Sequence, residues 1–470
     1  MPTASLDAIH RDPAVSQAIR ELRLLLGEES LLERPADLLA YDGDAYPGAR
    51  QLPAAVALPK TTEQVAAIVR LCNRYGVPYV PRGAGTGLSG GATPTPGCLV
   101  VSLARMNEIL EIDVPNRRVI AQVGCTNARI SEIVQAYGLH FAPDPSSQSV
   151  CTIGGNIAEN AGGPHTLKYG VTVNHVTGMR VVLPDGTVVD LGGKHEPEEP
   201  LDLIGLMVGS EGTLGIVTEA TLRLTPLPEA VRTLLAVFET VEDCTRCVVD
   251  IIARGVLPAA LEMIDRTILL AIEDAFHLGF PRDAAAVLTV ELDGSAESVE
   301  DEERCVQEVF EKHRAREVRS AANPAERERL WLARKKGVGT TGRLAASIVT
   351  QDGAIPRSRL PEVLAAVAER AQAHGIRVCN IFHAGDGNLH PCVLYDQSDP
   401  DEAERVHAFN QDVLALCVSA GGTITGEHGV GLEKRDAMAL MFGRADLALM
   451  KCIQTAFDPL QLCNPGKLLP

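Results

Sequence analysis

A run of glycines between residues 81 and 91 constrains this chain more than any other feature. The segment reads Pro-Arg-Gly-Ala-Gly-Thr-Gly-Leu-Ser-Gly-Gly, with five glycines in its last nine residues. Glycine has no side chain to bury, so the segment builds no core and leaves its backbone N–H groups accessible. Because a concave run of N–H groups binds anions, we expect this loop to hold a phosphorylated ligand.

The loop fits neither of the two common nucleotide-binding motifs in full. Residues 85–90 read G-x-G-x-x-G, and the apolar residues 77–80 before them predict the strand that a nicotinamide Rossmann site requires. That site also requires a helix, but residues 92–97 read Ala-Thr-Pro-Thr-Pro-Gly, which cannot begin one. No Gly-Lys-Ser or Gly-Lys-Thr closes the loop, so the Walker A motif is excluded as well.

The composition indicates a cytoplasmic protein of more than one domain. A chain of 470 residues has room for two or three domains with cores of their own. No apolar run approaches the roughly 18 residues of a membrane span, and the N-terminal residues do not resemble a secretory signal. A net charge of −18 argues against a nucleic-acid partner. We therefore expect a cytoplasmic chain, attached at most peripherally to the inner face of the membrane through partners.

Periodicity and turn signals predict two α+β domains. In the first, residues 1–228, a helical lead-in contains the periodic stretch 15–26, which Asp12-Pro13 opens. Further helices are predicted at 61–76 and 127–137, strands at 55–58, 99–103 and 214–224, and hairpins at 109–123 and 176–191. The proline-rich residues 225–228 are the best boundary. In the second, residues 229–470, strands at 233–238, 286–292, 347–350 and 377–382 alternate with helices at 299–313, 359–374 and 400–420, which predicts a sheet covered by helices.

Two more segments of glycine and small hydroxyl residues stand in the first domain. One covers residues 143–163 and includes Gly-Gly-Asn at 154–156, and the other is Gly-Ser-Glu-Gly at 209–212. Such residues let a flat or phosphorylated ligand approach the backbone closely. Three segments of this kind in one domain indicate a large, extended ligand.

A fourth cluster combines histidines with acids. Residues 383–390 read His-Ala-Gly-Asp-Gly-Asn-Leu-His, which predicts a strand, a tight turn and a second strand that returns two imidazoles to one point. Gly-Glu-His-Gly at 426–429 adds a carboxylate and a third imidazole, and its glycines permit a turn in which both face one cavity. Two histidines and a carboxylate suit Zn, Mn or Fe, and a non-haem iron oxygenase would use the same set.

Together these segments resemble the FAD-linked D-2-hydroxy acid dehydrogenases of the vanillyl-alcohol-oxidase class. Matching motifs also stand at 142–148, 159–163, 167–170 and 464–467, and the resemblance runs from about residue 40 to the C-terminus. It is greatest to the flavin subunits of bacterial glycolate oxidases and extends to the D-lactate dehydrogenases. It implies an α+β fold, with a two-lobed FAD-binding domain of that class and a substrate domain with an antiparallel sheet, whose C-terminal tail returns to the flavin.

The resemblance also implies where the cofactor binds. Family members with a covalent flavin carry a histidine in the phosphate loop, and this loop has none, so FAD is expected to be noncovalent. The implied contacts come from the loop, the second glycine segment, one strand and the tail: Pro81, Arg82, Gly83, Gly85, Thr86, Gly87, Leu88, Ser89, Pro143, Ser147, Gly154, Gly155, Asn156, Gly162, Gly163, Gly170, Ile216, Val217 and Asn464.

The metal and catalytic roles follow from the same resemblance. His383, His390 and Glu427 match positions that bind a divalent metal in related dehydrogenases. His428 matches the proposed base, and Arg334 matches an arginine that binds the substrate's carboxylate. With the hydroxyl proton taken by His428 and the hydride passed to the flavin, these parts would oxidise a 2-hydroxy acid.

The substrate and the electron acceptor are less closely defined. Relatives that act on 2-hydroxyglutarate carry a lysine where this chain has Thr-Gln-Asp at 350–352, so a small acid, glycolate or D-lactate, is expected. The twelve cysteines are scattered, and only Cys244 and Cys247 have C-x-x-C spacing, so no iron–sulfur cluster is expected here. Electrons would then leave to iron–sulfur and second flavin subunits or to a quinone. A D-lactate or D-2-hydroxyglutarate dehydrogenase and a noncatalytic flavin-carrying subunit stay open as alternatives.

Overall fold

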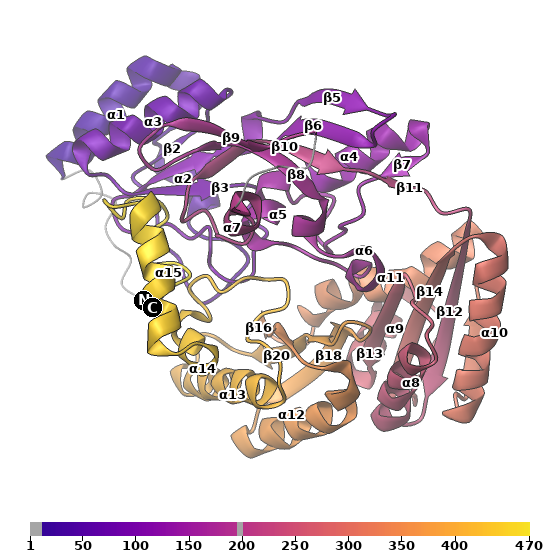
Figure 1. The fold of residues 1–470 in the computed structure, drawn as a ribbon. Coiled ribbons are helices and arrows are strands. Elements are labelled where there is room, and N and C mark those ends of the chain that lie inside the picture. Colours follow the sequence, from indigo (N-terminus) through magenta and orange to yellow (C-terminus); the bar gives the residue numbers. More distant parts are fainter. Residues whose placement is uncertain (1–11, 195–200) are drawn as a thin grey trace. The chain divides into compact units, whose positions relative to one another are not determined.

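The computed structural model describes residues 12–194 and 201–470, so the first residues of the predicted lead-in lie outside the described part (Figure 1). The chain forms two compact units. One takes in the chain up to Gly162, Val171–Leu227 and His428–Pro470, and the other takes in Gly163–Gly170 and Pro228–Glu427. No helix within the described ranges has the length and apolarity that a bilayer span requires.

The first unit contains two main sheets and the helices around them. Its strands are β1 (Leu31–Leu32), β2 (Ala55–Ala57), β3 (Tyr79–Arg82), β4 (Leu99–Ser102), β5 (Ile109–Asp113), β6 (Arg118–Gln122), β7 (Leu139–His140), β8 (Val176–Val182), β9 (Val188–Gly192), β10 (Ile216–Arg223) and β11 (Thr225–Pro226). Its helices are α1 (Pro13–Leu26), α2 (Pro35–Leu38), α3 (Thr62–Tyr75), α4 (Asn127–Val134), α5 (Ile153–Glu159), α7 (Leu203–Met207), α14 (Met438–Met441) and α15 (Arg444–Phe457).

The smaller sheet carries the glycine-rich loop. Its strand order is β1-β2-β4-β3, and β2 and β3 both run parallel to β4. Helix α3 connects β2 to β3; the Thr61 side chain caps its start, and Gly76, at φ 65°, ends it. Both ends of this helix are as predicted, whereas the strand predicted at 77–80 begins two residues later. The reason is that the Val77 N–H closes the helix end on the Cys72 carbonyl.

The larger sheet of this unit joins the two predicted hairpins. Strands β5 and β6 pair as one hairpin, β8 and β9 as the other, and β10 lies between β6 and β8. All of these pairings are antiparallel. One apolar core connects α1 and α3 with both sheets, through side chains such as Leu22, Ile68, Leu99, Val181 and Leu222.

The second unit is an antiparallel sheet with helices on both faces. Its strands are β12 (Ala230–Phe238), β13 (Ala260–Asp265), β14 (Ala286–Gly294), β15 (Glu317–Ser320), β16 (Ser347–Thr350), β17 (Gly353–Ala354), β18 (Arg377–His383), β19 (Asn388–Leu389) and β20 (Pro391–Tyr395). Its helices are α6 (Thr166–Tyr169), α8 (Val241–Ala253), α9 (Arg266–Phe276), α10 (Ala296–Lys312), α11 (Pro324–Thr341), α12 (Leu360–His374) and α13 (Pro400–Ser419).

Alternating side chains of β12 separate the two helix layers of this sheet. Leu235 packs in one cluster with Ile268 of α9 and Leu330 of α11. Phe238, which points to the other face, meets Phe310 of α10 edge to face, with ring centroids 6.5 Å apart. The strand order β15-β12-β14-β13-β18 places β13 and β18, whose ends carry the candidate site, next to each other.

Candidate functional site

The glycine-rich loop keeps its amides available. None of the backbone N–H groups of residues 83–91 donates a hydrogen bond to another group in the described part of the chain. Gly85 and Gly90 adopt left-handed backbone, at φ 76° and 84°. At Gly83 a Cβ would lie 2.3 Å from the Thr152 hydroxyl at the start of α5, so glycine is required for the loop to pack there. The loop therefore presents a row of backbone N–H groups that are available to a ligand.

The side chain of Arg82 joins the start of the loop to residues 40–43. Its guanidinium donates to the carbonyls of Gly43 (2.6 Å) and Ala40 (3.2 Å) and lies 5.2 Å from the centre of the Tyr41 ring. These bonds commit the guanidinium to residues 40–43. The Arg82 side chain therefore links the start of the glycine-rich loop to residues 40–43.

The C-terminal tail returns to this loop. Asn464, which is buried, donates from Nδ2 to the carbonyls of Gly91 (3.0 Å) and Glu211 (2.7 Å), and its N–H donates to Tyr79 of β3. The tail and two of the three glycine segments are thus brought together. Pro143 and Ser147 lie elsewhere in the same unit, where the Pro143 carbonyl accepts from buried Asn127.

The remaining predicted cofactor contacts lie at the start of α5, at the start of β10 and in the segment around residues 163–170. Gly155 donates to the Thr152 hydroxyl at the start of α5, while the Gly154 amide is spent on the Val123 carbonyl. Ile216 and Val217 lie at the start of β10. The glycines at 163 and 170 bracket a segment that belongs to the second unit, whereas Asn156 and Gly162 belong to the first.

The histidine cluster forms at the ends of strands in the second unit. His383 ends β18, a turn follows, and His390 lies between β19 and β20, as the sequence predicts. Glu427 Oε1 lies 3.1 Å from His383 Nε2 and 3.6 Å from His390 Nε2. The three side chains each offer a ligand atom within 4.8 Å of the other two. Both histidines are buried.

A glutamate that the sequence analysis missed supports this cluster. Glu262 of β13 lies directly across from His383 of β18, and its carboxylate oxygens lie 2.8 and 3.0 Å from His383 Nδ1. The same carboxylate accepts a hydrogen bond from Arg334 Nε, and Arg334 Nη2 lies 3.3 Å from His383 Nδ1. Arg334 is only 5% exposed, so it is not a surface arginine of α11. The one available signal was an acid within the otherwise apolar residues 260–264.

A second missed acid, Asp352, fixes the turn that carries Glu427. Its side chain is fully buried and accepts the backbone N–H groups of Gly426 (3.1 Å) and Glu427 (3.1 Å). Its Oδ1 also lies 3.5 Å from His390 Nε2. Asp352 thus links the turn that holds the carboxylate to one of the two imidazoles.

Comparison with known proteins decides the family. Residues 53–192 match the model of an FAD binding domain, and residues 227–468 match the C-terminal domain of FAD linked oxidases. The chain is 43% identical over 465 residues to the glycolate oxidase subunit GlcD of Escherichia coli (strain K12), which covers 99% of this chain and 93% of that protein. The chain belongs to the FAD-linked oxidases. It is also 34% identical over 472 residues to a D-lactate dehydrogenase of Anaerostipes hadrus, with 97% of each chain covered.

A solved structure confirms the predicted fold class. p-Cresol methylhydroxylase with substrate bound superimposes with a TM-score of 0.82 at 20% identity, over 97% of this chain and 96% of that one. This similarity shows that the FAD-linked oxidase has the fold of the vanillyl-alcohol-oxidase class, with mixed helices and antiparallel sheets. An FAD-linked oxidase holds a diphosphate, and the unspent amides of residues 83–91 suit one.

The electrostatics of the cluster follow from burial and close charges. Burial alone would lower the pKa of His383, but the carboxylates of Glu262 and Glu427 outweigh it and raise that pKa well above its usual value. Burial alone would raise the pKa of Glu262, but His383 and Arg334 hold it below its usual value. Burial raises the pKa of Asp386, in the turn between the histidines, to about 6. Two imidazoles and a carboxylate are the donor set of a divalent metal, so the residues present fit one.

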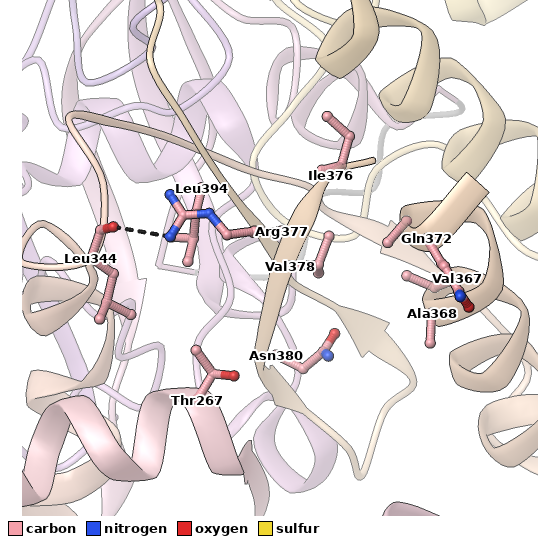
Figure 2. A pocket seen from close by; sticks show the side chains of 11 residues that line it. Thr267, Leu344, Val367, Ala368, Gln372, Ile376, Arg377, Val378, Asn380 and Leu394 are labelled. Carbon is pink, nitrogen blue, oxygen red and sulfur yellow. Dashed lines mark hydrogen bonds between the residues drawn. The ribbon is translucent and has the colours of Figure 1, made fainter. Parts of the chain in front are cut away.

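The described part of this oxidase also has a groove that is separate from the histidine cluster. It measures about 450 Å³ and opens in the second unit, where α12, β18 and β20 supply most of its largely apolar lining (Figure 2). Arg377 lines it and donates to the Leu344 carbonyl (3.4 Å). The histidines and acids described above do not line it.

Proposed function

We propose that this FAD-linked oxidase converts a small D-2-hydroxy acid, glycolate or D-lactate, into the 2-oxo acid. The observation that carries the proposal is the buried cluster of His383, His390 and Glu427 beside Arg334, a set able to bind both a metal and a carboxylate. The names of the relatives, glycolate oxidase subunit and D-lactate dehydrogenase, agree with a substrate of this class.

The cluster would hold a divalent metal through His383 Nε2, His390 Nε2 and Glu427. The hydrogen bond of His383 Nδ1 to Glu262 supports this, because it directs the other ring nitrogen toward Glu427. A bound metal would supply a Lewis acid and a template for the substrate's hydroxyl and carboxylate. The ion itself would be Zn, Mn or Fe.

Arg334 would bind the substrate's carboxylate. Its Nε and Nη2 face Glu262 and His383, while Nη1 makes no hydrogen bond to any described residue. That nitrogen is therefore available for a carboxylate oxygen. A monocarboxylate is favoured because Thr350 and Gln351 provide no cation for a second carboxylate.

His428, the residue after Glu427 in the chain, would take the proton of the substrate's hydroxyl. An imidazole has a usual pKa of about 6.5 and so accepts a proton at neutral pH. Bound FAD would supply the hydride acceptor, which no side chain can be. The absence of a histidine from residues 81–91 favours a noncovalent flavin, held within residues 1–228 with help from Asn464.

Electrons would then leave the flavin for iron–sulfur and second flavin subunits or for a quinone. This part of the proposal rests on the spacing of the twelve cysteines, among which only Cys244 and Cys247 have C-x-x-C spacing. Cys244 and Cys247 lie on α8, and both are buried.

An anaerobic titration tests the function. FAD-loaded protein is mixed with glycolate, D-lactate, L-lactate and D-2-hydroxyglutarate, and bleaching of the flavin band is followed. Glycolate or D-lactate should bleach it fastest, and His428→Ala should slow the bleaching at least a hundredfold. A flavin that none of the four acids reduces would refute the proposal and favour a noncatalytic flavin carrier. Fast turnover with O₂ alone would contradict the need for a partner acceptor.

A further inference from the structure

The Gly-Ser-Glu-Gly segment at 209–212 contains a buried carboxylate that the chemistry above does not use. Glu211 is 4% exposed and has a left-handed backbone at φ 52°. The glycines on either side, Gly209 and Gly212, adopt the same region, at φ 80° and 68°. Glycine adopts this backbone without strain, whereas glutamate does not. Favourable contacts of the Glu211 side chain must therefore offset the backbone strain.

Those contacts lie on the loop that begins at His428. Glu211 Oε1 accepts the Val430 N–H at 2.6 Å, and Oε2 accepts the Gly431 N–H at 2.7 Å. Each carboxylate oxygen thus holds one amide, two and three residues after His428. A glutamine of the same shape could not do this, because its amide nitrogen would face one of the two N–H donors.

The same loop is held from the other side by the glycine-rich loop. The Ser89 carbonyl accepts from the N–H groups of Leu432 (2.8 Å) and Glu433 (3.1 Å). A Cβ at Gly431 would lie only 2.2 Å from that carbonyl, so glycine is needed for this close approach. Residues 430–433 are therefore fastened at both ends, by Glu211 and by Ser89.

Two further bonds add to the attachment. Fully buried Lys434 donates to the Gly429 carbonyl at 3.0 Å, which closes the loop on itself. Asn464 donates to the Glu211 carbonyl, and so connects the tail to the same point. All of these groups belong to the first unit, as does His428.

We propose that Glu211 is a positioning residue. It fastens residues 430 and 431 next to the glycine-rich loop and thereby holds the imidazole of His428 in the orientation in which it accepts the substrate's proton. The role of His428 rests on the function proposed above, whereas the attachment of the loop does not. The proposal assigns to the third glycine segment a task other than ligand contact.

Hydrogen exchange tests the attachment by itself. In FAD-loaded protein, Glu211→Gln should speed the exchange of peptides that cover residues 428–433 at least tenfold. Glu273→Gln is the matched control, because the two oxygens of this buried carboxylate also hold one backbone N–H each, those of Gly279 (3.1 Å) and Phe280 (3.0 Å). The control should leave the exchange of 428–433 unchanged. Equal exchange in wild type and Glu211→Gln would overturn the proposal.

A double-mutant cycle tests the action through His428. Glu211→Gln should slow flavin reduction by the hydroxy acid at least tenfold while the bound FAD content stays the same. In a His428→Ala background, the same change should slow the residual reduction less than twofold. A tenfold loss in both backgrounds would show that Glu211 acts elsewhere and would refute the positioning role.

Failure of the proposed function is separately visible. If His428→Ala reduced its flavin at the wild-type rate, the base assignment would fall, while the exchange data would still decide whether Glu211 holds the loop. If Glu211→Gln does not fold with FAD, Glu211→Asp replaces it. That variant keeps the charge but shortens the reach, and the same accelerated exchange and slowed reduction are expected.

Discussion

Replacing Glu262 with glutamine should weaken metal binding at the histidine cluster. In the structure, the Glu262 carboxylate accepts from Arg334 Nε and lies 2.8 Å from His383 Nδ1. A carboxylate there holds the proton of His383 on Nδ1 and leaves Nε2 as a ligand. The glutamine would turn its NH₂ donor toward either Arg334 or His383, and in the second case the histidine proton moves to Nε2, which then cannot bind a metal.

The expected loss of metal affinity follows from the number of proposed ligands that the substitution affects. Partners that orient a metal-binding histidine typically contribute 10- to 100-fold in affinity, or about 1.4–2.8 kcal/mol. Only one of the three proposed ligands is disturbed, so we expect a loss of metal affinity in this range rather than complete loss. Isothermal titration of metal-free, FAD-loaded protein with Zn²⁺ or Mn²⁺ measures it.

Glu291→Gln is the matched control for this prediction. Glu291 lies on the neighbouring strand β14, is equally buried, and accepts from Arg327 (2.7 and 2.9 Å) and from Trp331 Nε1 (2.5 Å). Both substitutions weaken the pairing of a buried glutamate with an arginine, which is buried in Arg334 and partly exposed in Arg327, so each should lower the stability of the second unit, by about 2–4 kcal/mol at most. Only Glu262→Gln should also weaken metal binding. Metal affinity within twofold of wild type in Glu262→Gln, or equal loss in both variants, would refute the reasoning.

Three further outcomes are expected. Chelation should stop flavin reduction by the hydroxy acid without releasing FAD, and adding Zn²⁺ or Mn²⁺ back should restore it; unchanged reduction after chelation would count against a metal. Gly83→Ala should weaken FAD binding at least tenfold, measured by flavin fluorescence on dilution, because its Cβ would lie 2.3 Å from the Thr152 hydroxyl, while Gly339→Ala, which has open space around it in helix α11, should leave it unchanged. Burial alone would raise the pKa of Glu291, but its cationic partners lower it, so its stabilising contribution is complete above the unfolded pKa of about 4.3 and is lost as pH falls below that value. The stability difference between wild type and Glu291→Gln, measured by urea unfolding, should therefore shrink from pH 7 to pH 3; a difference that stays constant would contradict this.

Local signals predicted a large part of the fold. Helix α3 begins at the Thr61 cap and ends at Gly76, and α1 begins after Asp12, as their capping residues indicate. The two hairpins of the first unit were predicted from their turns. In the site, His383 and His390 come together because the turn that joins them is encoded within eight residues. Each of these features depends on neighbours in sequence.

Features that depend on strand register could not be predicted in the same way. The partner of His383 is Glu262, 121 residues earlier, and the two meet only because β13 pairs with β18 in one register. A shift of one residue would turn Glu262 to the opposite face of the sheet. The segment 163–170 is similar: Lys168 and Tyr169 bind Asp293 of β14, 125 and 124 residues away. Nothing in the local sequence specifies those partners.

The strand at 260–265 and its acid, Glu262, were missed for the same reason. Residues 260–265 were not among the predicted strands, because Glu262 interrupts the apolar pattern by which a buried strand is recognised. The carboxylate is buried there at a cost that only its contacts with Arg334 and His383 offset. Glu211 is the corresponding case in the first unit, an acid at a backbone angle that favours glycine. Positions at which a side chain conflicts with its local pattern are therefore the ones to test first for a role in the chemistry.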